Sequence, residues 1–429
     1  MTNKIKEVVS ERLSEKYYEI DHKSGLKIYV YPKENASSSY VIFGTRYGSI
    51  DTQFKLGTDT EFTCVPEGIA HFLEHKLFES EELDAFERYA KTGASANAYT
   101  SFDRTCYLFS CSGNLKENLE ILMDFVTHPY FTEATVQKEQ GIIGQEIKMT
   151  EDDPDWSVLF SLLRAMYKQH PVQIEIAGTV ESISQITAEL LYRCYNVFYN
   201  LGNMAICAVG NVDTDTVLEV ANRVLEYREP VKIERRFFPE PKEVNREYTE
   251  TTAPVGTPLF AMGIKENIPT PERTEREIII SQIILDVLCS KTSVLYNELL
   301  KEGLINTAFN YEYFCGYGYA MLLFSGESDN AAEVSKRIKE ALKELQKNGI
   351  KQEAFERVRR MLYGNTVKSL NSPEEIANDM IASVFSGESI FDAPEILSSL
   401  TLAEVNDRLK KAIDTDCSSL SVIKPEVQK

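Results

Sequence analysis

Two histidines and one glutamate in the first quarter of the chain have the residue types and spacing that metal-assisted hydrolysis needs. The segment His71-Phe72-Leu73-Glu74-His75 contains two of the chain's five histidines. On a helix, residues three and four positions apart share a face, so His71, Glu74 and His75 would point to the same side. Two imidazoles four residues apart can bind one zinc ion, and the carboxylate before the second can reach water on that ion. This H-x-x-E-H order predicts a zinc hydrolase site.

The neighbouring residues predict the helix that would carry this motif. Pro66 and Glu67 suit a first turn, because proline loses no hydrogen bond there and an acid favours the positive helix end. Ile69, Leu73 and Leu77 form an apolar stripe at helical spacing. A short pattern of this kind also arises by chance, and a single histidine on a helix is more often a solvated or core residue. Because catalytic zinc takes three protein ligands, the hypothesis requires a third ligand elsewhere.

A second predicted helix, over residues 135–149, offers the third ligand. Glu139 and Glu146 stand two helical turns apart and therefore share one face. On this prediction Glu146 reaches the metal, while Glu139 lies one layer behind it and supports a ligand. Gly141 and Gly144 weaken the helix by about 1 kcal/mol each, and we interpret them as a sign of close helix packing around a metal. The alternative is a solvated acidic face.

Together these motifs resemble the pitrilysin/insulysin-type zinc metallopeptidases, including their mitochondrial-processing-peptidase-like two-subunit branch. The H-x-x-E-H segment matches the family's zinc motif, and the second predicted helix resembles the family's distal helix. The resemblance implies that His71, His75 and Glu146 bind zinc. It also implies that Glu74 is the catalytic base and that Glu139 is a supporting acid. The resemblance covers the first half of the chain well and the second half in outline.

The third ligand has one alternative. His75 and Glu146 are a few residues closer along the chain than the family pattern usually has. Glu151 would restore the usual separation, but it lies at the helix end beside residues 152–154. The spacing within the distal motif favours Glu146.

The segment 93–100, Gly-Ala-Ser-Ala-Asn-Ala-Tyr-Thr, resembles the part of the family that leads into a substrate-holding edge strand. By this resemblance Asn97 and Ala98 contact substrate, which would add as an extended strand near residues 97–110. The zinc would lower the pKa of its bound water to about 7 and polarise the peptide carbonyl. Glu74 would take the water proton and pass it to the leaving amine. Main-chain pairing reads little sequence, so selectivity would come from side-chain pockets.

The second half lacks two residues that active family members carry opposite the zinc. These are an arginine and a tyrosine seven residues apart around a Gly-Leu pair. Aligned on Gly303-Leu304, this chain has Leu299 and Asn306 at those positions. Neither side chain supplies the charged or phenolic donor that would steady a substrate carbonyl. In the two-subunit branch a homologous partner carries this Arg/Tyr pair, so the resemblance predicts that this chain is the zinc-bearing subunit of a heterodimer.

Two other functions stay open at this point. The first is a non-catalytic peptide-binding or scaffold subunit of the same fold, and the second is a purely structural metal. Glu74 argues against the first, because nothing structural requires a carboxylate beside the metal. Structural zinc usually has four closed ligands, mostly cysteine, and no cysteine is obviously placed to be the fourth.

Length and patterning predict two domains. A chain of 429 residues exceeds one ordinary core, and 43% hydrophobic with 26% charged residues is typical of a folded protein. We expect an α+β fold of two related domains, each an antiparallel sheet with helices packed against it. The predicted division is a zinc-bearing domain 1–225, a charged, proline-bearing linker 226–248 and a related non-metal domain 249–429. In the second domain we predict strands near 260–264, 308–314 and 317–325 and helices over 275–288, 331–348 and 352–370.

Composition also bounds the environment and the partners. The N-terminus lacks the apolar core of a signal peptide, and no run approaches the length of a membrane span. The eight cysteines are scattered without a C-x-x-C pair, as free thiols in a reducing compartment are. We therefore expect a cytoplasmic protein without a membrane partner. The net charge of −20 argues against a nucleic-acid partner, because phosphate binding needs a basic surface. A weaker hypothesis is that an acidic interior surface favours basic peptides as substrates.

Overall fold

The computed structural model describes residues 3–57, 59–81, 83–267 and 270–426, and the chain divides into two compact units. Each unit is assembled from three stretches of chain. Unit 1 comprises the residues up to Ile147, Glu175–Arg236 and Val367–Phe391. Unit 2 comprises Lys148–Ile174, Phe237–Thr366 and the residues from Asp392 onward.

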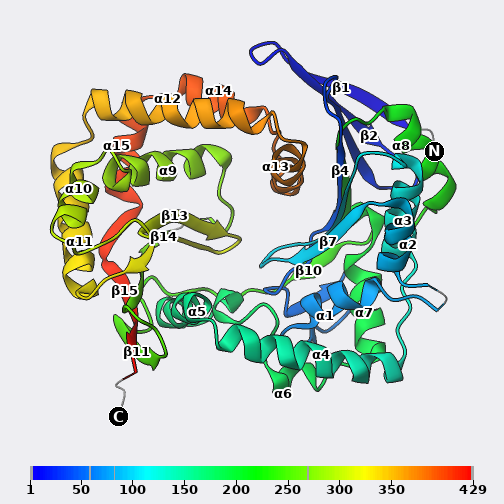
Figure 1. The fold of residues 1–429 in the computed structure, drawn as a ribbon, viewed down its shortest axis with the longest axis horizontal. Helices are drawn as coiled ribbons and strands as arrows, with labels where there is room; N and C mark the ends of the chain where they lie inside the picture. Colours follow the sequence, from blue (N-terminus) through cyan, green and yellow to red (C-terminus); the bar gives the residue numbers. More distant parts are fainter. Residues whose placement is uncertain (1–2, 58, 82, 268–269, 427–429) are drawn as a thin grey trace. The chain divides into compact units, whose positions relative to one another are not determined.

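Unit 1 is built on a seven-stranded sheet in the order β1-β2-β3-β9-β4-β8-β7 (Figure 1). All neighbouring strands are antiparallel except β3 and β9, which are parallel. The central strands β4 and β9 are buried along their whole length, as expected where helices cover both faces of a sheet. The strands are Lys4–Ser10 (β1), Glu15–Asp21 (β2), Lys27–Pro32 (β3), Ser39–Thr45 (β4), Ser95–Thr100 (β7), Thr105–Cys111 (β8) and Met204–Gly210 (β9).

Helices cover both faces of this sheet. Side chains of β4 alternate between them: Val41 and Phe43 face one helical layer, whereas Tyr40 and Ile42 face the other. The first layer contains α1 (Ile69–Leu77), α2 (Ala85–Thr92), α3 (Leu115–Thr127), α4 (Glu133–Glu151), α6 (Val180–Ile183), α7 (Ala188–Phe198) and α8 (Thr214–Val224). The second layer is α13 (Pro373–Ser386), which comes from the second half of the chain.

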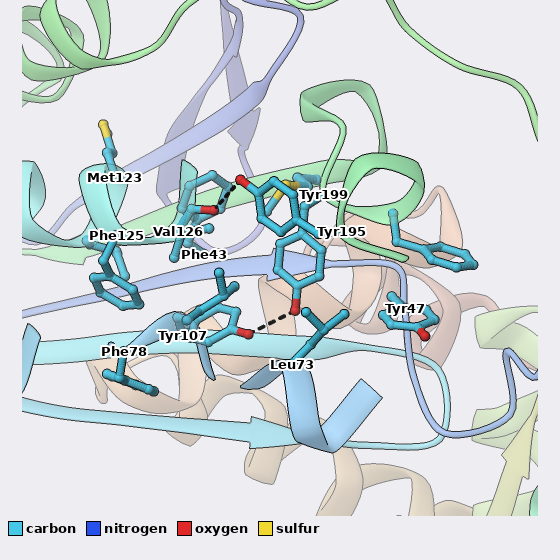
Figure 2. Packing of buried hydrophobic residues seen from close by; sticks show 14 of the residues in the cluster. Phe43, Tyr47, Leu73, Phe78, Tyr107, Met123, Phe125, Val126, Tyr195 and Tyr199 are labelled. Atoms are coloured by element: carbon cyan, nitrogen blue, oxygen red, sulfur yellow. Dashed lines mark hydrogen bonds between the residues drawn. The ribbon is translucent and has the colours of Figure 1, made fainter. Parts of the chain in front are cut away.

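The first layer holds α1 through a core that is rich in aromatic side chains (Figure 2). Leu73 on α1 is fully buried in this cluster, beside two tyrosines from the sheet and from the residue after α7. The hydroxyls of these tyrosines, Tyr107 and Tyr199, lie 2.8 Å apart. A third tyrosine, Tyr195, donates its hydroxyl to the carbonyl of Val126. The hydroxyls of Tyr107, Tyr199 and Tyr195 are thus hydrogen-bonded inside the apolar core, as such groups need to be.

The predicted linker contains a strand of unit 1. A three-stranded sheet has the order β10-β5-β6, formed by Ile233–Arg235 (β10), Gln53–Leu56 (β5) and Thr63–Cys64 (β6). Arg235 donates from Nε to the buried carboxylate of Asp51 over 2.7 Å. Residues 226–248 therefore do not form one free connection, because this pairing fixes Ile233–Arg235, and the change of unit falls after Arg236.

Unit 2 is built on a five-stranded sheet in the order β11-β15-β12-β14-β13. Here β11 and β15 are the parallel pair, and the other neighbours are antiparallel. The strands are Tyr248–Ala253 (β11), Leu259–Glu266 (β12), Asn310–Gly316 (β13), Tyr319–Glu327 (β14) and Ile413–Pro425 (β15). The helices are α5 (Pro154–Met166), α9 (Glu275–Cys289), α10 (Val294–Lys301), α11 (Ala331–Asn348), α12 (Gln352–Ser369), which continues into unit 1, α14 (Asp392–Ser399) and α15 (Leu402–Lys411).

The two sheets share one topology. If β1 and β2 are set aside, the sheet orders are β3-β9-β4-β8-β7 and β11-β15-β12-β14-β13. When the five strands of each sheet are numbered along the chain, both orders read 1-5-2-4-3. In both sheets strands 1 and 5 are the parallel pair. The predicted α+β fold with two related domains is confirmed. The sheets are mixed rather than purely antiparallel, because the last strand of each half returns beside the first in the same direction.

Each half of the chain also contributes one helix to the other unit, which departs from the predicted domains 1–225 and 249–429. Helix α5 packs on β12 and β15 of unit 2, where a Cβ at Gly263 would lie 3.0 Å from the Met166 sulfur. Helix α13 packs on β4 and β9 of unit 1 through Ile376, Ala377, Met380 and Ile381. Each sheet thus gains the cover of its second face from the other half of the sequence.

No single helix within the described ranges has the length and apolar character needed to cross a membrane. The bent pair α9 and α10 meets those criteria together by length and composition alone.

Candidate metal centre

Helix α1 begins later than the sequence pattern predicts. Pro66 and Glu67 precede the helix, which starts at Ile69 after Gly68 as its N-cap. Gly68 has a φ of 84°, and a Cβ there would lie 2.2 Å from the carbonyl oxygen of Ala177. Only glycine fits this left-handed, closely approached position, so the chain turns there and the first-turn role predicted for Pro66 and Glu67 is wrong.

The structure brings the three predicted zinc ligands together. One ligand atom from each of His71, His75 and Glu146 lies within 4.8 Å of the others. Nε2 of His71 is 3.5 Å from one carboxylate oxygen of Glu146, and Nε2 of His75 is 3.4 Å from the other. Two imidazole nitrogens and one carboxylate are the donor set of many catalytic zinc sites, so these residues fit a zinc ion.

Glu139 lies behind the three potential ligands, next to the ring nitrogen of His75 that faces away from Glu146. Its Oε1 is 3.0 Å from Nδ1 of His75, and its side chain is almost fully buried. Burial by itself would lower the pKa of His75, but the hydrogen bond to Glu139 and the charge of Glu146 outweigh burial and raise it. Burial would raise the pKa of Glu139, and its hydrogen bond to His75 outweighs this and lowers it.

Glu74 points to the edge strand of the sheet. Its Oε2 accepts a hydrogen bond of 2.6 Å from the hydroxyl of Thr100, the last residue of β7. Burial raises the pKa of Glu74, although the adjacent His71 and the Thr100 hydrogen bond both oppose that rise. A buried carboxylate base beside three metal-type ligands is an arrangement that can move a proton during hydrolysis.

Sequence reasoning missed Thr100. The residue lies within the segment that resembles the family, yet its type alone gives no sign of a contact with Glu74. The available signal was its position at the strand end, on the same face as Ala98 and Ala96.

The predicted substrate residues Asn97 and Ala98 lie on β7, which is the outer strand of the sheet. The N–H of Ser101 donates to the carbonyl of Arg104, which fixes the hydrogen-bonding pattern of the hairpin. In an antiparallel pair the N–H groups of alternate residues point to the neighbouring strand. The N–H groups of Ser101, Tyr99 and Asn97 therefore point to β8, and the N–H of Ala98 points away from it. That N–H donates instead to the side chain of Asn97, over 2.9 Å.

The structure agrees with setting Glu151 aside but contradicts the interpretation of the two glycines of α4. Glu151, the alternative third ligand, is exposed at the end of α4 and lies outside the group of potential metal ligands. Gly141 and Gly144 do not mark close packing, because a Cβ at either would meet no atom of the described residues within 4 Å. The helix tolerates these glycines, whereas their neighbours Val136, Ile143 and Ile147 attach it to the core.

The position aligned with the family arginine lies in the core of unit 2. Leu299 is 1% exposed and packs in that core, so a charged side chain there would be buried. The next residue, Leu300, is 36% exposed. Asn306, at the predicted tyrosine position, donates its amide to Glu327.

Unit 2 also has a helix carboxylate that accepts a hydrogen bond from the edge strand of its sheet, but its helix lacks the histidines. Helix α9 is the first helix after β12, as α1 is the first helix after β4, and the sequence of α9 contains no histidine. Asp286 on α9 accepts a hydrogen bond of 2.8 Å from the hydroxyl of Tyr311 on β13. Both units thus have a hydrogen bond between a helix carboxylate and a hydroxyl of the edge strand, but Thr100 is the last residue of β7 whereas Tyr311 is the second residue of β13, and only unit 1 carries the histidine pair.

The two-unit fold and the H-x-x-E-H segment of α1 resemble those of the inverted-motif zinc peptidases, and comparison with known proteins agrees. Residues 64–180 match the family described as Insulinase (Peptidase family M16), and residues 185–362 match the family described as Peptidase M16 inactive domain. The uncharacterized zinc protease YmfH of Bacillus subtilis is 39% identical over 428 residues, which cover 98% of this chain and 100% of that protein. The chain therefore belongs to peptidase family M16.

Two other relatives extend the comparison. The zinc protease PqqE of Helicobacter pylori is 25% identical over 380 residues, covering 84% of this chain and 82% of that protein. The crystal structure of an M16-like peptidase from Alicyclobacillus acidocaldarius superposes with a TM-score of 0.91 at 33% identity, covering 99% of each chain.

Proposed function

We propose that this chain is the zinc-bearing subunit of an endopeptidase that hydrolyses extended oligopeptides. The observation that carries the proposal is the convergence of His71, His75 and Glu146, whose ligand atoms lie within 4.8 Å of one another. Membership of a family with relatives named zinc proteases supports zinc as the metal.

Each residue of the site has a distinct task in this proposal. His71, His75 and Glu146 hold zinc, and Glu139 fixes the orientation of His75. Bound zinc supplies Lewis-acid polarisation of a peptide carbonyl and activation of water. Glu74 accepts the proton of the attacking water on its carboxylate and delivers it to the departing amine nitrogen.

The edge strand β7 and its last residue position the reactants. The outward N–H of Ala98 offers main-chain pairing to an extended peptide once the Asn97 side chain moves aside. Thr100 holds the Glu74 carboxylate through its hydroxyl and so directs the base. These contacts recognise the backbone of a peptide rather than a particular sequence.

We further propose that a homologous partner subunit supplies the missing Arg/Tyr pair. The buried Leu299 and the amide of Asn306 support this idea, because neither provides a donor of the required kind. The match of residues 185–362 to a domain described as inactive points the same way. The lack of these donors at Leu299 and Asn306, and the match to a domain described as inactive, also favour one alternative. This alternative is a non-catalytic peptide-binding or scaffold subunit.

Zinc content and peptide cleavage test the proposal together. We expect the purified chain to bind one zinc ion and to cleave peptides faster when a homologue bearing the Arg/Tyr pair is added. Glu74→Gln should retain zinc and lose about 100- to 10,000-fold of that activity. Glu87→Gln, a change of the same type on the exposed face of α2, is the control. Zinc binding without cleavage under every condition supports the non-catalytic alternative, and equal activity of the chain alone rejects the partner.

A further inference from the structure

A polar cavity of about 340 Å³ lies in unit 1 beside the edge strand. Its walls include Asn97 and Tyr99 of β7, Tyr40 of β4, and Glu374 and Asn378 of α13. The cavity therefore lies between the sheet and α13, on the face of β7 that is turned away from the metal ligands.

The alternation of β7 establishes which face is which. Thr100 bonds Glu74, and Ala98 and Ala96 pack on the core that holds α1, so these residues share the metal face. Side chains of a strand alternate, which places Asn97 and Tyr99 on the opposite face. Tyr99 confirms this assignment by donating its hydroxyl to Asn378 on α13, over 3.4 Å.

A peptide that pairs with the free edge of β7 would carry the same alternation. Neighbouring strands lie about 4.8 Å apart, and directly opposed residues point their side chains to the same face. Every second side chain of the peptide would thus face the metal side, and those between would face α13. A peptide residue opposite Asn97 or Tyr99 would direct its side chain toward the cavity.

The lining of the cavity favours a cationic guest. Among the described residues, Glu374 is the only charged side chain that lines the cavity, and no lysine or arginine of this part of the chain pairs with its carboxylate within 4.0 Å. Asn378 is held by its own bonds to the carbonyl of Glu374 and to Tyr40, so its amide is fixed in the wall. Hydroxyl, amide and carboxylate oxygens along one wall are acceptors for an ammonium or guanidinium group.

From this geometry we infer that the cavity is a specificity subsite for a lysine or arginine side chain of the bound peptide. The inference rests on the proposed function, because it takes β7 as the strand to which peptide adds. It assigns sequence selectivity to the α13 face, which the metal residues do not touch. Glu374 would contact the side chain of one substrate residue. That residue belongs to the alternate residues of the peptide whose side chains face α13 and not the metal.

Peptide binding tests this subsite without relying on catalysis. The full chain carrying Glu74→Gln, with zinc present, is titrated into fluorescein-labelled ten-residue Ala/Ser peptides that differ at one central position, Lys, Gln or Glu. We expect the Lys peptide to bind about three- to tenfold more tightly than the Gln peptide, the range of one partly exposed charged contact. Adding Glu374→Gln should remove the preference, and Glu374→Lys should transfer it to the Glu peptide.

Glu375→Gln is the matched control, because Glu375 lies in the same first turn of α13 but does not line the cavity. Equal affinities for the three peptides, no peptide binding, or a Lys preference that survives Glu374→Lys would each overturn the subsite. Cleavage by the chain without Glu74→Gln, measured in parallel with and without the homologous partner, separates the two proposals. Cleavage without discrimination leaves the proposed function standing, whereas discrimination without any cleavage leaves the subsite standing.

Discussion

Glu139 on α4 and His75 on α1 are joined by a contact of 3.0 Å between Oε1 and Nδ1. In this contact the Nδ1–H donates to the carboxylate, which leaves the lone pair of Nε2 directed toward Glu146. The contact therefore selects the imidazole tautomer that a metal ligand needs, and it ties the two ligand-bearing helices together behind the ligand atoms.

Replacing Glu139 should weaken zinc binding without removing it. Glu139→Gln keeps an acceptor for His75 but loses the charge, and we expect zinc affinity to fall about 10- to 100-fold. Glu146→Gln removes a ligand and should abolish stoichiometric binding. Competition against a colorimetric chelator measures both effects. Glu151→Gln is the control, since this exposed residue should bind no metal; zinc loss there, with Glu146→Gln unaffected, would reverse the assignment of the third ligand.

The hydroxyl of Thr100 should matter for turnover but not for zinc. Thr100→Val retains the shape of the side chain and removes the 2.6 Å hydrogen bond to Glu74. We expect kcat to fall about tenfold, the cost of one charge-assisted hydrogen bond at about 1.5 kcal/mol, with zinc content unchanged. Thr100→Ser restores a hydroxyl and should recover most of the rate. Equal losses for valine and serine would mean that packing, and not the hydrogen bond, explains the effect.

Much of this site was predictable because its geometry is local. The spacing of His71 and His75 on one helix and of Glu139 and Glu146 on another follows from helical periodicity alone. Long amphipathic patterns were equally informative: the helix predicted at 331–348 is α11, and the helix predicted at 352–370 is α12 with an end one residue earlier. The roles of the site residues, and the cytoplasmic location, stay predictions.

Features that depend on tertiary contacts were not predictable in this way. An amphipathic pattern shows that α5 and α13 each have an apolar face, but it does not tell which sheet covers that face, so their exchange between units was missed. Thr100 reaches Glu74 only through the register of the hairpin β7–β8. The start of α1 depends on Gly68, where a Cβ would collide with the backbone of Ala177, far away in sequence.

The buried tyrosine pair beneath α1 should show non-additive substitution effects. Tyr107 and Tyr199 are 0% and 1% exposed, and their hydroxyls lie 2.8 Å apart. Tyr199→Phe leaves the Tyr107 hydroxyl without this partner, and we expect it to lower the free energy of unfolding by about 1–3 kcal/mol. Adding Tyr107→Phe removes the stranded hydroxyl, so the double variant should be no less stable than the single one. Urea unfolding of the two singles and the double measures the coupling; simple additivity would contradict it.

His170 should make unit 2 sensitive to acid. The side chain is 1% exposed, and both ring nitrogens are used in the neutral form: Nε2 donates to the carbonyl of Tyr317 and Nδ1 accepts from the N–H of Val172. Protonation would place a second proton against that N–H. Burial accordingly lowers the pKa of His170 from 6.5 to about 4.

A pKa that is lower in the folded than in the unfolded chain means that the unfolded chain binds more protons at acidic pH. The stabilisation from neutral His170 is therefore complete above pH 6.5 and declines as the pH falls from about 6.5 toward about 4. Between pH 7 and pH 5 this group should cost about 2 kcal/mol of unfolding free energy. His170→Gln keeps one donor and one acceptor but does not titrate, so its loss of stability over that interval should be smaller by about that amount. Urea unfolding at the two pH values tests this, with the exposed His128→Gln as the control. If His170→Gln and the unmodified chain lose the same free energy between pH 7 and pH 5, His170 is not the acid-sensitive group.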